Sequence, residues 1–126
     1  KVLGADAENV LTLIRHDLGE EEMKVTVDAN GDITGVNKTC NPADAVGESL
    51  GIERMGKAYT RALYQELDVM MNREHLENKF YELAFERLIA QGHTYKIADV
   101  TELFSCELDT FEDFEHAKEK IPASLY

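Results

Sequence analysis

The chain has 126 residues, of which 44% are hydrophobic and 30% charged, which is enough for one domain with its own core. Asp and Glu number 25 against 13 Lys and Arg, so the formal net charge is -12. This charge repels nucleic-acid backbones and anionic membranes, so we expect neither as a partner. Cys40 and Cys106 lack metal-ligand spacing, and the sequence shows no export signal or long apolar run. We therefore expect a cytoplasmic protein.

Strand patterns fill the first half of the chain. Residues 10–15 (VLTLIR) form a short apolar run typical of a buried strand. Residues 23–28 then alternate between apolar and polar side chains, and residues 33–36 return after an Asn-Gly pair, which predicts a hairpin. Residues 46–55 read as a further strand that contains two glycines. A glycine inside a strand indicates close approach of another backbone or of a ligand.

The period changes from Lys57 onward, where apolar residues recur at helical spacing. Two consecutive helices are predicted. The apolar positions of the first are Tyr59, Leu63, Leu67 and Met70, and those of the second are Phe80, Tyr81, Ala84, Phe85, Leu88 and Ile89. Gly92 is expected to end the second helix, and residues 95–100 to form a strand.

The stretch CELDTFEDFEHA, residues 106–117, combines an acidic segment with an amphipathic pattern. If residues 107–109 form a strand end, Glu107 and Asp109 point to the same side, as two hard oxygen ligands that suit Mg²⁺. The alternative is that both carboxylates only favour the N-terminus of the following helix.

A helix is predicted after this acidic segment. Thr110 and Asp113 are spaced like a capping box at its start. The expected buried stripe consists of Phe111, Phe114, Ala117 and Ile121.

A family resemblance rests on three stretches of the chain. They are VTVDANGDITGVNKTCNPADAVGESLGIERM, ENKFYELAFERLIAQG and CELDTFEDFEHAKEKI. In this order they resemble the C-terminal half of sugar-phosphate nucleotidyltransferase-like proteins, closest to the phosphocholine and 2-aminoethylphosphonate cytidylyltransferases. The resemblance implies an α/β fold with a mixed, mostly parallel sheet covered by helices, the C-terminal part of a Rossmann-like nucleotidyltransferase fold. Residues 1–126 would be the acceptor-binding part of one domain, with the nucleotide-binding part absent from this chain and the fragment alone inactive.

The implied reaction transfers a nucleotidyl group, CMP from CTP, to a small phosphorylated or phosphonate amine and releases pyrophosphate. Mg²⁺ is the implied cofactor because the reaction joins two anionic reactants. By resemblance, Asp109 is a metal ligand with Glu107 beside it as a metal or substrate-amine ligand, and Lys38 grips the acceptor phosphate. Lys38 can equally be a solvated loop lysine.

Glu48, Tyr81 and Glu82 resemble the residues that contact the amine headgroup. A carboxylate beside an aromatic face is what an ammonium group selects. The alternative for Tyr81 is packing in the core, because it lies at helical core spacing with Phe80. The chain has no Trp, which choline-binding relatives often carry at this place, so a trimethylammonium group and a smaller amine both stay open.

Two other functions remain open from the sequence. One is a sugar-1-phosphate nucleotidyltransferase, which uses the same fold. The other is a non-catalytic regulatory or dimerisation module derived from this fold, and a homodimer is compatible with either class.

Overall fold

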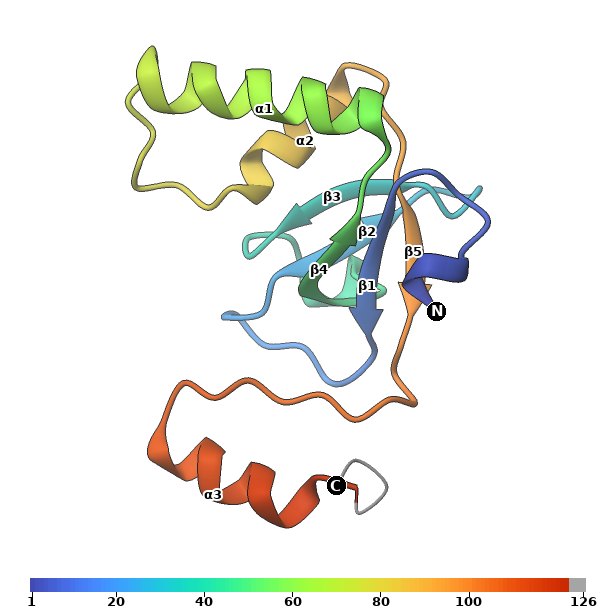
Figure 1. Cartoon of the computed structure of the whole chain (residues 1–126), viewed down its shortest axis with the longest axis vertical. Coiled ribbons are helices and arrows are strands. Elements are labelled where there is room, and N and C mark those ends of the chain that lie inside the picture. The colour runs from blue at the N-terminus through green and yellow to red at the C-terminus, as the bar shows by residue number, and fades with distance from the viewer. Residues whose placement is uncertain (123–126) are drawn as a thin grey trace.

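The computed structural model describes residues 1–122, which form an α/β structure with one five-stranded mixed sheet and three α-helices (Figure 1). The strands are β1 (Val10–Ile14), β2 (Lys24–Val27), β3 (Ile33–Asn37), β4 (Gly47–Arg54) and β5 (Lys96–Asp99). The helices are α1 (Lys57–Asn72), α2 (Glu82–Ala90) and α3 (Phe111–Lys120), with 3-10 turns at Val2–Gly4 and Pro42–Asp44. The predicted α/β class is confirmed, as are the five strands predicted within residues 10–100 and the three predicted helices. No helix within residues 1–122 combines the length and apolar character that a membrane crossing needs.

The sheet has the order β3-β2-β4-β1-β5. Only β1 and β5 run parallel, and the other neighbouring pairs of described strands are antiparallel. The prediction of a mostly parallel sheet is therefore wrong. The tight turn between β2 and β3 decides that pair, because so short a connection joins only antiparallel strands. Gly31 adopts φ +75° in this turn, as the Asn-Gly pair predicts.

The core lies between the sheet and the first two helices. Leu11 and Leu13 of β1 are at most 1% exposed, and Phe85 and Leu88 of α2 pack with them. Tyr59 of α1 joins the same cluster. Figure 1 shows α1 and α2 together at one end of the sheet. This cluster anchors the start of α2 beside β3.

The opposite sheet face carries Thr12, Leu50 and Ile52, over which the segment 101–110 passes. The strand predicted at residues 107–109 is wrong, because this segment has no regular structure. A strand needs a hydrogen-bonded neighbour, and the segment pairs with none of the described strands. Figure 1 shows it as an extended connection that leads to α3 at the far end of the molecule.

The start of α3 is confirmed, but most of its predicted buried stripe is not. Thr110 and Asp113 form the capping box, with the Asp113 N–H donating to Thr110 Oγ1 at 3.1 Å and the Thr110 N–H donating to the Asp113 carboxylate at 2.9 Å. Phe111 and Phe114 are 72% and 48% exposed, whereas Ala117 is buried. The stripe stays largely open because α3 lies away from the sheet face that would cover it.

Candidate functional site

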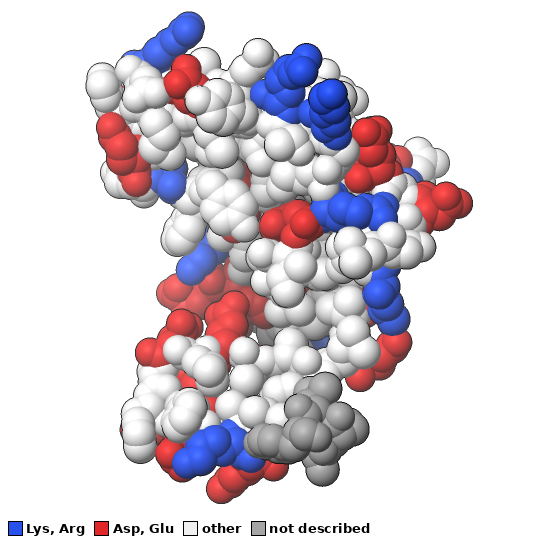
Figure 2. Space-filling model, in the orientation of Figure 1, with Lys and Arg blue, Asp and Glu red and all other residues white. Residues whose placement is uncertain are grey.

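One depression brings together four of the six side chains that the sequence nominates. Lys38 follows β3, Glu48 lies in β4, Glu82 is the first residue of α2, and Glu107 comes from the segment after β5. We call this cavity of about 210 Å³ the acidic depression. It is lined by Glu21, Met23, Lys38, Glu48, Ser49, Leu50, Gly51, Glu82 and Glu107. Figure 2 shows acidic side chains gathered in the hollow between the body of the molecule and α3.

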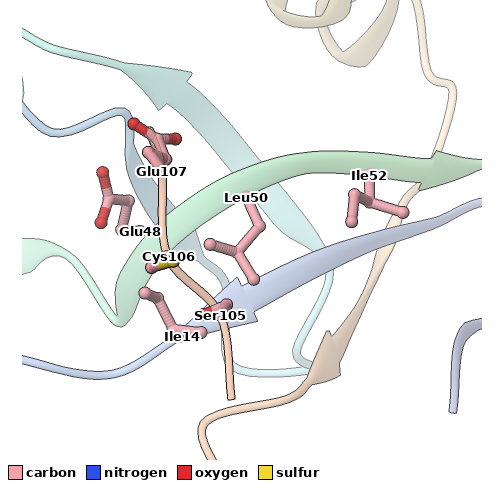
Figure 3. Close-up of a pocket in the computed structure, with 7 residues that line it drawn as sticks. All are labelled: Ile14, Glu48, Leu50, Ile52, Ser105, Cys106 and Glu107. Carbon is pink, nitrogen blue, oxygen red and sulfur yellow. The ribbon is translucent and has the colours of Figure 1, made fainter. Parts of the chain in front are cut away.

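Glu48 and Glu107 also line an adjoining cavity of about 290 Å³ on the open sheet face. Figure 3 shows their carboxylates at the same end of this cavity, with Leu50 and Ile52 extending beyond them along β4. Residues from β4 and from the irregular segment are thus placed next to each other. The two carboxylates are 59 positions apart in sequence, so only the tertiary fold unites them.

Lys38 is the cation of the acidic depression. Its Nζ lies 3.3 Å from Glu21 Oε2 and 5.0 Å from the centroid of the Phe80 ring. The side chain is about one-third exposed, so its ammonium is accessible to a ligand. An ammonium on a flexible stem is well suited to hold a phosphate group.

Glu82 is 8% exposed, and its Oε2 is buried without a hydrogen-bond partner among residues 1–122. A buried carboxylate oxygen without a partner costs free energy, since water no longer solvates it. Its place at the first position of α2 offsets part of that cost through the helix dipole. The arrangement leaves a negative group ready for a cation.

Tyr81 lies beside the depression rather than in its lining. Its hydroxyl donates to Glu53 Oε1 at 3.3 Å, and its ring meets Phe85 edge-on at 5.2 Å between centroids. Burial raises the pKa of the Tyr81 hydroxyl and also raises the pKa of the Glu53 carboxyl. Tyr81 therefore holds the start of α2 against β4 and lies beside Glu82, whose carboxylate also raises the pKa of the Tyr81 hydroxyl.

The structure explains why glycine occupies both positions 47 and 51 of β4. A Cβ at Gly47 would collide with the Ile14 carbonyl oxygen of β1, which is the close backbone approach predicted for this strand. Gly51 has φ +66° at the place where the pairing of β4 with β1 shifts register. This irregularity bends β4 where Gly51 forms part of the floor of the acidic depression.

The two predicted metal ligands, Glu107 and Asp109, lie in different surroundings. Glu107 lines the acidic depression, whereas Asp109 is exposed and lies outside it. Within residues 1–122, no three His, Cys, Asp or Glu side chains cluster closely enough to hold a metal ion. Mg²⁺ commonly takes only one or two protein carboxylates, with water and substrate phosphates as further ligands. Glu107 and Asp109 are each of the donor type that Mg²⁺ takes, although only Glu107 lines the depression.

Sequence reasoning nominated neither His16 nor Glu21 as a site residue. His16 Nε2 lies 2.6 Å from Glu48 Oε2, and this hydrogen bond raises the pKa of His16. No sequence signal links two residues 32 positions apart. Glu21 belongs to a run of three glutamates before β2, and such a run is typical of a solvated segment.

Lys24 holds the loop that carries Glu21. The alternation in β2 predicts a polar, outward residue here, but Lys24 is 1% exposed. Its ammonium donates to the backbone carbonyls of Gly19, Glu20 and Glu22 at 3.0–3.3 Å. All three of its donors are used, so Lys24 has none left for a ligand.

No known protein-family model matches the chain, and a comparison with curated proteins also finds no match. The resemblance to nucleotidyltransferases therefore stays a prediction.

Proposed function

We propose that this chain is the acceptor-binding part of a Mg²⁺-dependent cytidylyltransferase of the Rossmann-like nucleotidyltransferase fold. The intact enzyme transfers CMP from CTP to a small phosphorylated or phosphonate amine and releases pyrophosphate. One observation carries the proposal, namely the gathering of Lys38, Glu48, Glu82 and Glu107 around the acidic depression.

The charges of the depression match a ligand with an anionic and a cationic end. Lys38 binds the phosphate or phosphonate group, and Glu48 and Glu82 attract the amine. Tyr81 supports this arrangement through its hydrogen bond to Glu53. A sugar 1-phosphate is favoured less, because it has no cationic group to balance the charge of several carboxylates in one cavity.

In the reaction, an oxygen of the acceptor phosphate attacks the α-phosphorus of CTP, and the bond to the pyrophosphate oxygen breaks. Glu107 and Asp109 would hold Mg²⁺, which offsets the charge of the two anionic reactants when bound. Lys38 orients the attacking oxygen and lowers the repulsion between acceptor and nucleotide. The role of the chain is therefore to position the acceptor.

The open sheet face supports a larger intact domain. Ile52 and Leu103 are 58% and 52% exposed on this face, and they line cavities with Leu50 and Phe104. Apolar surface of this kind is usually covered by further protein. In our proposal the nucleotide-binding part packs here. The exposed Phe111 and Phe114 of α3 favour the second candidate, a non-catalytic module that binds a partner through this helix.

The test uses the full-length product of the gene with CTP, Mg²⁺ and a panel of phosphorylated and phosphonate amines. We expect pyrophosphate release that Lys38→Met and Asp109→Asn each lower at least ~100-fold, as expected for loss of a charge that orients or stabilises the reacting groups. Lys57→Met is the matched control, since Lys57 is an exposed lysine at the start of α1. Absence of turnover with every acceptor, or full activity of Lys38→Met, would refute the proposal.

A further inference from the structure

His16 lies where the end of β1 meets the start of β4. In the antiparallel pairing of these strands, Ile14 is opposite Glu48. His16 follows Ile14 on the same side of the chain, which brings its side chain within diagonal reach of Glu48. Glu48 lines both the acidic depression and the adjoining cavity, whereas His16 is outside the lining of both. His16 therefore contacts Glu48 from outside the ligand cavity.

Both ring nitrogens of His16 are engaged. Nδ1 lies 2.8 Å from the backbone carbonyl oxygen of Asp17, which can only accept a hydrogen bond. Nε2 lies 2.6 Å from Glu48 Oε2, and an ionised carboxylate also only accepts. The two nitrogens are both donors only in the imidazolium form of histidine. The geometry thus favours a positively charged His16.

The charged groups around His16 agree with this form. The hydrogen bond to Glu48 of β4 raises the pKa of His16, and so does the charge of Glu22 in the loop between β1 and β2. The neighbouring cation, Arg15, is directed to β5, where its Nε donates to the Asp99 carboxylate at 2.7 Å. His16 therefore faces negative charge from β4 and from its own loop.

Glu48 is the group through which His16 can act on a ligand. Its Oε2 accepts the hydrogen bond from His16, which leaves its second oxygen to the cavity that Glu48 lines. Glu107 adds a second carboxylate to the same cavity, so Glu48 has a like charge on the ligand side and a cation on the other. The His16 N–H orients the Glu48 carboxylate, and the imidazolium partly neutralises its charge.

We propose that His16 is a positioning residue for Glu48, whose Nε2–H orients the Glu48 carboxylate toward the acidic depression and whose second proton sets how strongly that carboxylate attracts a cationic ligand. The inference rests on the proposed function, in which Glu48 attracts the amine of the acceptor. His16 itself does not touch the ligand. It makes the affinity for the acceptor dependent on pH.

The two protonation states of His16 differ in charge but share the hydrogen bond to Glu48. When His16 loses one proton, the hydrogen that stays on Nε2 keeps the charge-assisted bond to Glu48, and the weaker bond to the Asp17 carbonyl is given up. Glu48 stays oriented, but its charge is no longer offset. For a partly exposed pair, the gain in affinity for a cationic ligand is roughly three-fold.

The first experiment is calorimetric titration of the full-length product of the gene with phosphoethanolamine and, separately, with phosphocholine. It is done at about pH 5.5 and about pH 8.5, on the two sides of the titration of His16. Each variant is compared with the wild type at the same pH, so the titration of the ligand's own phosphate cancels. His16→Gln keeps an N–H donor for Glu48 without a charge, and His16→Leu supplies neither donor nor charge.

At the lower pH, we expect His16→Gln to bind both amines roughly three-fold more tightly than the wild type, and at the higher pH equally well. His16→Leu should bind them roughly three-fold more weakly than the wild type at the higher pH, because the Glu48 carboxylate is no longer oriented. His75→Gln is the matched control and should change neither affinity. His75 also lies beside a glutamate, 3.5 Å from Glu77, but in the loop between α1 and α2.

NMR titration of His16 is a second readout, which a purely structural role would not change. Saturating phosphoethanolamine should lower the pKa of His16, because the bound ammonium competes with the imidazolium for the charge of Glu48. Inorganic phosphate has no ammonium group and should not lower it.

Three results would each overturn the inference. They are equal affinities of His16→Gln and the wild type at the lower pH, full affinity of His16→Leu at the higher pH, and a pKa of His16 that phosphoethanolamine leaves unchanged or raises. In each case, binding of the phosphorylated amines that Lys38→Met abolishes keeps the proposed function intact. Failure of both amines to bind overturns the inference, and absence of pyrophosphate release with the whole acceptor panel overturns the proposed function as well.

Discussion

Replacing Glu82 by glutamine tests whether the chain maintains an uncompensated charge for its ligand. The Oε2 of Glu82 is buried and, among the described residues, has no partner, which costs about 1–3 kcal/mol of folding free energy. Glutamine removes the charge but keeps a buried polar group, so it recovers only part of this cost. We take the recovered part as about 1.5 kcal/mol.

A second effect opposes this gain. Glu82 is the first residue of α2, where a negative charge interacts favourably with the helix dipole by about 0.3–1 kcal/mol. Glu82→Gln loses that interaction. The two effects leave a net stabilisation of about 1 kcal/mol, or a rise of about 0.5 M in the urea midpoint for a domain of this size. The same variant should bind the phosphorylated amine more weakly, because Glu82 attracts the amine in the proposed function.

Urea denaturation followed by circular dichroism measures the change. Glu20→Gln is the control, because it removes one negative charge from an exposed position of the same acidic chain, and it should shift stability by less than about 0.5 kcal/mol. A Glu82→Gln variant that is less stable than the wild type by 1 kcal/mol or more would refute the reasoning. It would mean that the Glu82 carboxylate already has a favourable partner and is not reserved for a ligand cation.

Two further predictions concern Lys24 and His16. Lys24→Met leaves three backbone carbonyls without their charged donor and should destabilise the chain by about 2 kcal/mol in urea denaturation. The control Lys96→Met, which removes one partner of a half-exposed ion pair, should cost no more than about 0.5 kcal/mol. Equal losses of stability in the two variants would refute the role of Lys24. The pKa of His16, measured by NMR titration, should lie above 6.5 and return toward that value in Glu48→Gln, since the hydrogen bond to Glu48 raises it. Because the folded-state pKa is raised, this pair stabilises the fold fully below pH 6.5, and its contribution of about 0.5 kcal/mol is lost as the pH rises through the folded-state pKa of His16. Unchanged titration of His16 in Glu48→Gln would contradict this account.

Local sequence signals predicted the elements whose determinants are local. The apolar run of β1, the Asn-Gly turn between β2 and β3 and the capping box at Thr110 each need only neighbouring residues, and each is confirmed. The strand expected at residues 107–109 failed because pairing depends on a partner elsewhere in the chain. The parallel sheet failed for a related reason, since strand direction is set by connections and not by composition.

The candidate site was predicted in part, through the family resemblance. Lys38 and Glu82 were nominated from that resemblance, and the structure brings both to one depression. Periodicity could not have shown this, because helical spacing placed Phe80 in the core and strand alternation placed Lys24 in solvent. Both side chains are decided by long-range contacts that the local pattern does not encode.

The position of Glu82 explains how a fold of marginal stability can keep such a charge. Its carboxylate lies at the N-terminus of α2, where the helix dipole lowers the cost of burial, and the Tyr81–Glu53 hydrogen bond ties that end of the helix to β4. Phe85 and Leu88 fix the same helix in the core. Because the helix is anchored on both sides, the carboxylate cannot move to solvent without breaking these contacts. A bound cation would offset the free-energy cost of burying Glu82, so the gain in stability of Glu82→Gln and its weaker binding of the phosphorylated amine should appear together.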